Sequence, residues 1–121
     1  MIKVIKKVFD VKDIDQLINM ISKQFLKNNL SVDHDNILNS LENALSEKSR
    51  AVLFLDQNEK GIYQGFVFAN VSSGLESGGD YLWINELYID EPYQKQKIGS
   101  EFMQFIENWC KENNLRYILC I

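Results

Sequence analysis

The sequence predicts a mixed α/β (α+β) fold in the order βααβββαβ, and three kinds of pattern support that prediction. Three segments carry apolar residues at helical spacing. Five shorter segments have the length and the β-branched or aromatic content of strands. Polar turns that contain glycine or asparagine separate several of these segments. At 121 residues the chain can bury one core, so we expect a single domain over residues 1–121.

The N-terminal part of the chain is expected to form one strand and two helices. Residues 2–9 contain valine, isoleucine and phenylalanine, and we place this strand at or near a sheet edge. In residues 14–25 the apolar side chains recur every three or four positions, which predicts the first helix. A second amphipathic helix is expected to begin after Ser31 or Asp33 and to end before Arg50.

The next segment has the pattern of a β-hairpin followed by a surface loop. Residues 51–56 are mostly apolar and of strand length, and a polar turn leads from them into a strand over residues 62–71. Gly65 interrupts the second strand and indicates either a bulge or a close approach of backbone. Residues 72–80 are rich in glycine and serine, which predicts a loop.

Residues 81–100 are the segment around which the rest of the chain is organised. Aromatic and β-branched residues over 81–90 predict a buried strand that ends before Pro92. A polar turn follows, and an amphipathic helix is expected to begin near Ile98. Residues 116–121 have the composition of a last buried strand, which this crossover helix would place parallel to the strand over 81–90.

The turn before this helix has the layout of an anion-binding site. The first N–H groups of a helix have no partner within the helix, and the helix dipole is positive at that end. These groups can hold a phosphate, and Lys95 and Lys97 add positive charge beside them. A solvated turn before an ordinary helix can have the same composition, so the turn alone does not establish a site.

The turn and the strand before it resemble motif A of the GNAT superfamily of acyl-CoA N-acyltransferases. In that motif a strand is followed by Gln/Arg-x-x-Gly-x-Gly/Ala and then by a helix. Residues 94–99 read Gln-Lys-Gln-Lys-Ile-Gly, in which Gln94, Ile98 and Gly99 fit the motif. Lys97 stands where the family usually has the first glycine, a residue that lets the backbone approach a pyrophosphate.

The resemblance extends upstream through the chain, including Gly65, and stops at Ile121, before the family's usual last helix and two strands. It implies a GNAT-like, mainly antiparallel sheet with helices packed on it, truncated at its C-terminal end. It also implies an acetyl-CoA-dependent N-acetyltransferase that acts on a primary amine of a small molecule or peptide, by direct attack in a ternary complex.

The resemblance assigns the acetyl-CoA site to two groups of residues. The pantetheine arm would lie along the positions that match the family's splayed strand, Leu87, Tyr88 and Ile89. The pyrophosphate would be held by backbone N–H groups, with the two lysines as charge partners, over Gln94, Lys95, Gln96, Lys97, Ile98, Gly99 and Ser100.

Glu86 is the candidate catalytic residue. An amine with a pKa of about 10.4 is only about one part in a few thousand neutral at pH 7, so a base assists its attack. Similar enzymes often carry an acidic residue at this position as a base or an amine anchor. Alternation along a strand puts Glu86 and Tyr88 on one face. A structural glutamate is the alternative interpretation, and no residue is assigned as the general acid.

Composition excludes several other classes of function. A net charge of −4 argues against nucleic acid as the main partner. We find neither a secretory signal nor an apolar run long enough to span a bilayer, so we expect no membrane partner and a cytoplasmic location. Two cysteines and one histidine are too few for a recognisable zinc site, so no metal is expected, and Cys110 and Cys120 are interpreted as core thiols.

Two further hypotheses remain open. The chain could be a non-catalytic, truncated GNAT-fold module for binding or assembly, or an α/β domain that binds another phosphorylated ligand at the same helix. The last strand is apolar and has no covering element, which predicts a homodimer or a complementing chain that associates through residues 115–121.

Overall fold

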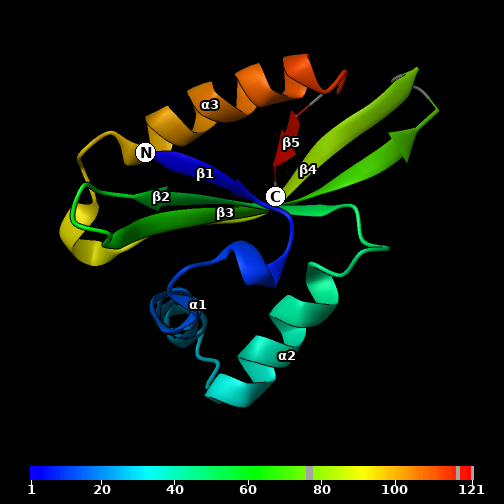
Figure 1. The fold of residues 1–121 in the computed structure, drawn as a ribbon. Helices are drawn as coiled ribbons and strands as arrows, with labels where there is room; N and C mark the ends of the chain where they lie inside the picture. Colours follow the sequence, from blue (N-terminus) through cyan, green and yellow to red (C-terminus); the bar gives the residue numbers. More distant parts are fainter. Residues whose placement is uncertain (76–77, 117, 121) are drawn as a thin grey trace.

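The computed structural model describes residues 1–75, 78–116 and 118–120. A five-stranded sheet in the order β1-β2-β3-β4-β5 forms its central layer (Figure 1). The strands are β1 (Ile2–Ile5), β2 (Ala51–Gln57), β3 (Tyr63–Gly74), β4 (Gly79–Ile89) and β5 (Ile118–Cys120). The helices are α1 (Ile14–Lys27), α2 (His34–Ala44) and α3 (Ile98–Glu112), with short 3₁₀ turns at Val8–Asp10 and Glu91–Tyr93.

The sheet is mixed and mainly antiparallel, as the sequence predicts. The strands β1 to β4 pair antiparallel in sequence order, and β5 pairs parallel to β4 after the α3 crossover. The element order βααβββαβ is therefore confirmed, and so is the position of the first strand at a sheet edge. No helix in the described part of the chain has the length and apolar character needed to cross a membrane.

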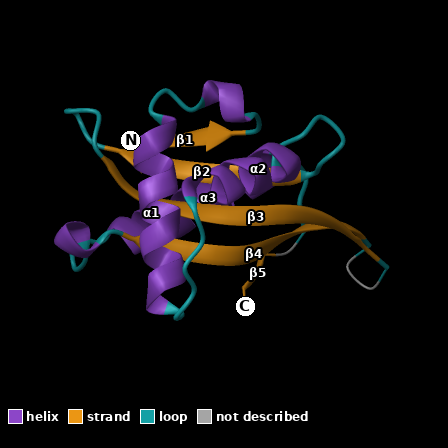
Figure 2. Ribbon diagram, turned by 90° about the horizontal axis from the view of Figure 1, so that it is seen from below, coloured by secondary structure: helices purple, strands orange, loops and turns teal. Residues whose placement is uncertain are grey.

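Two apolar layers hold the helices to the sheet. Helices α1 and α2 cover one face and α3 covers the other, as Figures 1 and 2 show. Side chains alternate along each strand, so Leu53 and Phe66 join the α1–α2 layer, and Phe54 and Val67 join the α3 layer. The side chains of Ile98, Phe102, Ile106 and Cys110 bury one face of α3 in this second layer.

Helices α1 and α2 begin at aspartate caps. The Asp13 side chain accepts a hydrogen bond from the backbone N–H of Gln16 at 3.2 Å, and Asp33 accepts one from Asn36 at 2.8 Å. Of the two predicted starts of the second helix, the one after Asp33 is the one observed.

The predicted first strand over residues 2–9 is too long. The strand ends at Ile5, and Val8–Asp10 form a 3₁₀ turn in which Phe9 is 95% exposed. Composition favours a strand here, but β2 pairs only with residues 2–5, so the following residues have no neighbouring strand to extend along.

The predicted loop over residues 72–80 is also too long, because both strands of the β3–β4 hairpin continue into it. Ser72 pairs with Tyr81 in the described register, despite the glycine and serine content of the segment. Arg50 donates a hydrogen bond to the Ser73 hydroxyl and forms an ion pair with Asp80, which ties the start of β2 to this extension. Long-range pairing therefore outweighs local turn preference in this segment.

Register shifts and a close backbone contact shape β3 and β4, and one shift makes Gln64 an extra residue in β3, beside Gly65. Asn85 is an extra residue in β4, because Phe68 pairs with Glu86 whereas Ala69 pairs with Ile84. At Gly65 a Cβ atom would lie 2.6 Å from the carbonyl oxygen of Tyr88, so the predicted close approach of backbone is confirmed.

Candidate functional site

The C-terminal end of β4 leads into the turn before α3. The described residues of β5 pair with Leu82, Trp83 and Ile84, and Ile84 directly precedes the bulge at Asn85. Residues 86–89 of β4 lie beyond that point.

Two predicted site residues, Gln94 and Gln96, hold this turn with their side chains. Gln94 Nε2 donates to the carbonyl oxygen of Ile89 at 3.1 Å, and Gln96 Nε2 donates to that of Pro92 at 3.3 Å. Both amides are thus engaged within the chain. The local sequence after Pro92 shapes the turn, and its two glutamines stabilise that shape.

The backbone of the turn presents the start of α3 to the outside. Lys95 and Lys97 have φ angles of 66° and 65°, in the left-handed region that glycine adopts most readily. Lys97 is the N-cap of α3, and its carbonyl oxygen accepts the first intrahelical bond, from Glu101 N at 3.0 Å. The residues between Lys97 and Glu101 are Ile98, Gly99 and Ser100. Their N–H groups precede the first intrahelical bond and can donate to an anion.

The first three residues of α3 have different environments. Ile98 is 5% exposed and anchors the start of α3 in the α3 layer. A Cβ atom added at Gly99 would meet no atom within 4 Å, so the backbone there is bordered by open space. Ser100 and both lysines are exposed. The arrangement combines a helix end that is packed in the core, an accessible backbone and the two exposed lysine side chains.

A cavity at the end of β4 brings four of the predicted residues together. Leu87, Tyr88, Ile89 and Gln94 line a space of about 390 Å³, together with three residues at the end of α1 that the sequence did not single out: Gln24, Lys27 and the C-cap residue Asn28. Their spacing of three and four positions puts them on one side of the last turns of the helix. The sequence shows this polar strip on the helix, but only the fold shows that the strip faces β4.

The α1 residues around this cavity have defined interactions. Lys27 Nζ lies 5.2 Å from the centre of the Tyr88 ring, and Lys23 Nζ lies 3.4 Å from the Asp90 carboxylate. Gln24 Oε1 is buried and accepts no hydrogen bond from any described group. It is therefore an acceptor that a bound molecule could satisfy.

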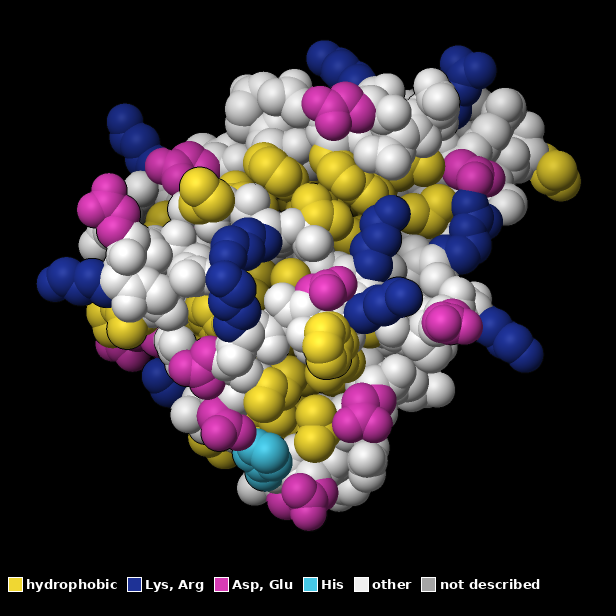
Figure 3. Space-filling model, viewed as in Figure 1, with side chains coloured by type: hydrophobic (Ala, Val, Ile, Leu, Met, Phe, Trp, Pro, Cys, Tyr) yellow, Lys and Arg dark blue, Asp and Glu magenta, His cyan; other side chains and the backbone are white. Residues whose placement is uncertain are grey.

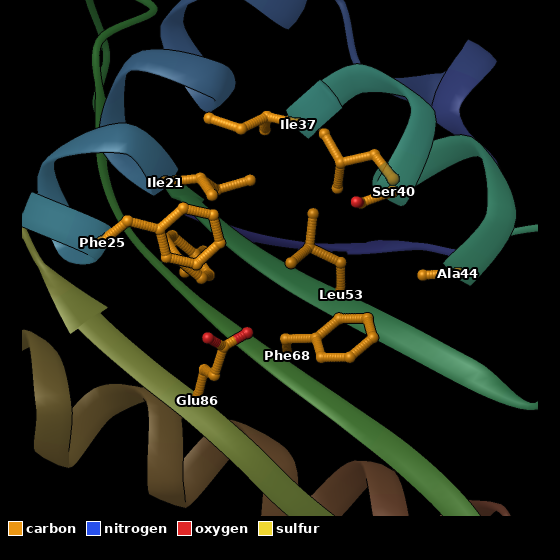
Figure 4. Close-up of a pocket in the computed structure, with 10 residues that line it drawn as sticks. Ile21, Phe25, Ile37, Ser40, Ala44, Leu53, Phe68 and Glu86 are labelled. Carbon is orange, nitrogen blue, oxygen red and sulfur yellow. The ribbon is translucent and has the colours of Figure 1, made fainter. Parts of the chain in front are cut away.

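Glu86 lies on the opposite side of the bulge from the β5 pairing, in a second and mostly apolar cavity. Its half-buried side chain lines a space of about 120 Å³ between α1, α2 and the sheet, and Figure 4 shows its carboxylate pointing toward Phe25 and Phe68. Within the described ranges, no group forms a hydrogen bond or ion pair with this carboxylate. Burial raises the pKa of Glu86 above its usual value, which makes the carboxylate a stronger base.

Tyr88 shares this face of β4 with Glu86, as strand alternation predicts. Its ring packs beside Phe66 at a centroid distance of 5.8 Å, and its hydroxyl donates to Asp90 at 3.1 Å. Burial and the nearby Asp90 carboxylate raise the pKa of Tyr88 to about 12. Tyr88 itself lines the cavity at the end of β4, and Glu86, two residues before it on the same face, lines the apolar cavity.

A comparison with known protein families decides what kind of domain carries this site. The model of the acetyltransferase (GNAT) family matches residues 14–121. The chain belongs to the GNAT acetyltransferase family. The match includes both cavities, the turn before α3 and the whole of α3.

Solved structures share the GNAT fold at low sequence identity. A probable acetyltransferase gives a TM-score of 0.86 at 16% identity, over 100% of this chain and 78% of that one. An aminoglycoside acetyltransferase from an uncultured soil metagenomic sample, solved with sisomicin, gives 0.78 at 19% identity, over 100% and 76%. A ribosomal-protein-alanine N-acetyltransferase from Brucella melitensis gives 0.78 at 12% identity, over 99% and 78%. No curated protein sequence matches the chain.

Other tyrosine and cysteine side chains have structural surroundings or lie outside the described residues. Tyr63 is buried, and its hydroxyl accepts a hydrogen bond from the N–H of Asp13 at 2.9 Å. Cys110 is a free thiol in the α3 layer, and burial raises its pKa to about 11. Tyr117 lies outside the described residues, as does part of the predicted association region 115–121. Among the described side chains, no cluster has the make-up of a metal site.

Proposed function

We propose that residues 1–121 form one N-acetyltransferase domain, which transfers an acetyl group from acetyl-CoA to a primary amine of a small molecule or peptide. The observation that carries this proposal is the juxtaposition at β4. The cavity lined by Leu87, Tyr88 and Ile89 also includes Gln94 of the turn before α3, and Glu86 lines the neighbouring cavity between α1, α2 and the sheet. A donor and an acceptor could thus meet near the bulge at Asn85.

The donor side suits the chemistry of acetyl-CoA. The N–H groups of Ile98, Gly99 and Ser100 can donate to phosphate oxygens, and Lys95 and Lys97 can add charge. The open space beside Gly99 lets an anion approach the backbone. Gln24 Oε1, buried and without a partner among the described groups, can accept a hydrogen bond from an amide N–H of the pantetheine arm.

The acceptor side suits the deprotonation of an amine. Glu86 takes a proton from the ammonium group, and the neutral amine attacks the thioester carbonyl while both substrates are bound. The new C–N bond forms as the C–S bond breaks, and the amine's second proton passes to the departing thiolate. Glu86 then releases its proton to solvent. Because its carboxylate has no partner among the described residues, it is available for this exchange.

Ligand binding tests the donor side separately from chemistry. Unfolding temperature should rise with acetyl-CoA concentration, and ATP or NAD at equal concentration should raise it less, because a ligand stabilises according to its affinity for the folded state. Release of free CoA thiol with amine present then tests transfer. Binding without transfer to any amine would favour the non-catalytic module, and a preference for ATP or NAD would contradict the acetyl-CoA assignment.

Two further predictions concern the setting of the domain. We propose a cytoplasmic location and association of two copies, or of a complementing chain, through residues 115–121. The second proposal rests on β5, which is an edge strand of the described sheet. Light scattering over a dilution series should show a dimer that Leu119→Lys dissociates, whereas a parent protein that is monomeric at high concentration would contradict it.

A further inference from the structure

The cavity beside Glu86 has hydrocarbon walls and a polar mouth. Buried side chains from α1, α2 and β2 form its floor, among them Ile21, Ile37 and Leu53. Of its lining residues, Glu86 and Ser40 carry polar side chains, the first half-buried and the second exposed. A molecule that enters meets one carboxylate and one hydroxyl near the surface and apolar groups below them.

The surface over this region is also mixed. Figure 3 shows the molecule in the same view as Figure 1. In the part where α1 and α2 lie, hydrophobic side chains reach the surface, with acidic and basic side chains around them. On this face no broad area of a single charge adjoins them. Individual charged groups at the cavity, rather than the electrostatic field of a large charged surface, therefore select a ligand by its charge.

The carboxylate of Glu86 sets the charge of the group that binds beside it. No described residue forms an ion pair with it, and the apolar side chains around it weaken its hydration. An ammonium group is its natural partner, and one such group satisfies it. The cavity lining offers no second carboxylate for another cation.

The volume of the cavity limits the apolar part of the ligand. An apolar cavity of about 150 Å³ can hold a benzene molecule. The space beside Glu86, about 120 Å³ and open at one side, therefore suits a short alkyl chain or a single phenyl ring. A larger apolar group would have to remain outside the cavity.

The same lining disfavours acceptors with many polar groups. Each hydroxyl that loses water without gaining a partner weakens binding roughly 5- to 150-fold, and an additional unpaired ammonium weakens it more. The floor residues Ile37 and Leu53 offer no hydrogen-bonding side chain. Although a structural neighbour was solved with the aminoglycoside sisomicin, the likeness to it shows the fold alone.

We propose that the acceptor is a primary monoamine on one small apolar group, with its ammonium at Glu86 and its apolar group between α1 and α2. This inference rests on the proposed function and names its acceptor class. It combines one carboxylate without a described partner with an apolar space of matching size.

A set of simple amines tests the proposal. From ethylamine to pentylamine, kcat/KM should rise about 4-fold for each added CH₂ until the cavity is filled. Pentylamine should exceed 1,4-diaminobutane at least roughly 10-fold, because these two molecules have the same number of heavy atoms but the second carries an ammonium at its far end. 2-Phenylethylamine should be accepted, and sisomicin should be a poor acceptor.

Substitutions on α2 locate the effect. Ala44 lines the cavity, so Ala44→Phe should remove the preference for pentylamine while ethylamine is still acetylated. Asn39 is exposed on the same helix and does not line the cavity, so Asn39→Phe is the matched control and should keep the preference. If Ala44→Phe fails to fold, Ala44→Leu should reduce the preference in the same direction.

Binding without turnover distinguishes this inference from the proposed function. Ligand-observed NMR should detect pentylammonium bound to the parent protein and to Asn39→Phe, but less to Ala44→Phe. Such binding with no acetyl transfer would support the amine site and contradict the proposed function. Preferred acetylation of 1,4-diaminobutane or sisomicin would overturn this inference and leave the proposed function standing. If pentylamine is neither bound nor acetylated, the inference is wrong.

Discussion

Two regions next to β4 differ in how they can recognise a ligand: the turn that follows the strand and the cavity beside Glu86. On the donor side, the turn from Gln94 to Ser100 offers mainly backbone N–H groups and two exposed lysines. On the acceptor side, the cavity near Glu86 is built from side chains of α1, α2 and three strands. Under the proposed function, one short segment binds the common donor, whereas selection of the acceptor depends on the packing of distant elements.

Loss of the Glu86 charge is expected to have the largest effect. Glu86→Gln should lower turnover about 100-fold near neutral pH and less at high pH, where the amine loses its proton unaided. A pH–rate profile measures this difference, with Glu42→Gln on the exposed side of α2 as the control. A loss of equal size at every pH would instead indicate an anchoring role, and unchanged rates would remove Glu86 from the mechanism.

Closing the space beside Gly99 should affect only the donor side. Gly99→Ala is expected to weaken acetyl-CoA binding roughly 10-fold if phosphate approaches the backbone there. The fold should tolerate it, because the new Cβ meets no atom within 4 Å, and helix propensity favours alanine by up to about 1 kcal/mol. Calorimetric titration and thermal unfolding measure the two effects. Unaltered affinity would place the phosphates elsewhere.

Lys97 permits a test of charge against crowding. Glycine and asparagine tolerate its φ of 65° better than lysine, so Lys97→Gly and Lys97→Asn should each stabilise the fold, by roughly 1 kcal/mol or less. Weaker acetyl-CoA binding in both variants would show that the lysine charge matters. Tighter binding in Lys97→Gly alone would show that the side chain crowds the ligand. If the parent does not bind and neither variant changes this, the cradle assignment is wrong.

The smallest expected effect concerns stability at the acceptor side. Burial raises the pKa of Glu86 above its ordinary value of 4.5, so the charged form is disfavoured in the folded state. Glu86→Gln should therefore unfold at slightly higher denaturant concentration at pH 8. This gain should shrink as the pH falls through the folded-state pKa and vanish below about pH 4, where the carboxyl is protonated in both states. A gain that persists at pH 3 would have another cause.

Local patterns predicted those elements whose formation depends mainly on their own residues. The amphipathic spacing in α1 and α3 and the start of α3 at Ile98 follow from side chains within a few positions, whereas the start of α2 was left open between Ser31 and Asp33. The same reasoning failed at residues 6–9 and 72–80. Pairing with a neighbouring strand is absent in the first case and present in the second.

By itself, the sequence determined the element order, the family motif and the donor-side backbone, because each is encoded in a continuous segment. Only the tertiary structure decided that Gln24 and Lys27 face the end of β4, and that Glu86 opens into an apolar space rather than into water. These placements depend on how α1 and α2 pack across the sheet. Helical spacing shows which face of a helix is apolar. The packing of the helix on the sheet determines which polar residues at the edge of that apolar face lie next to a strand.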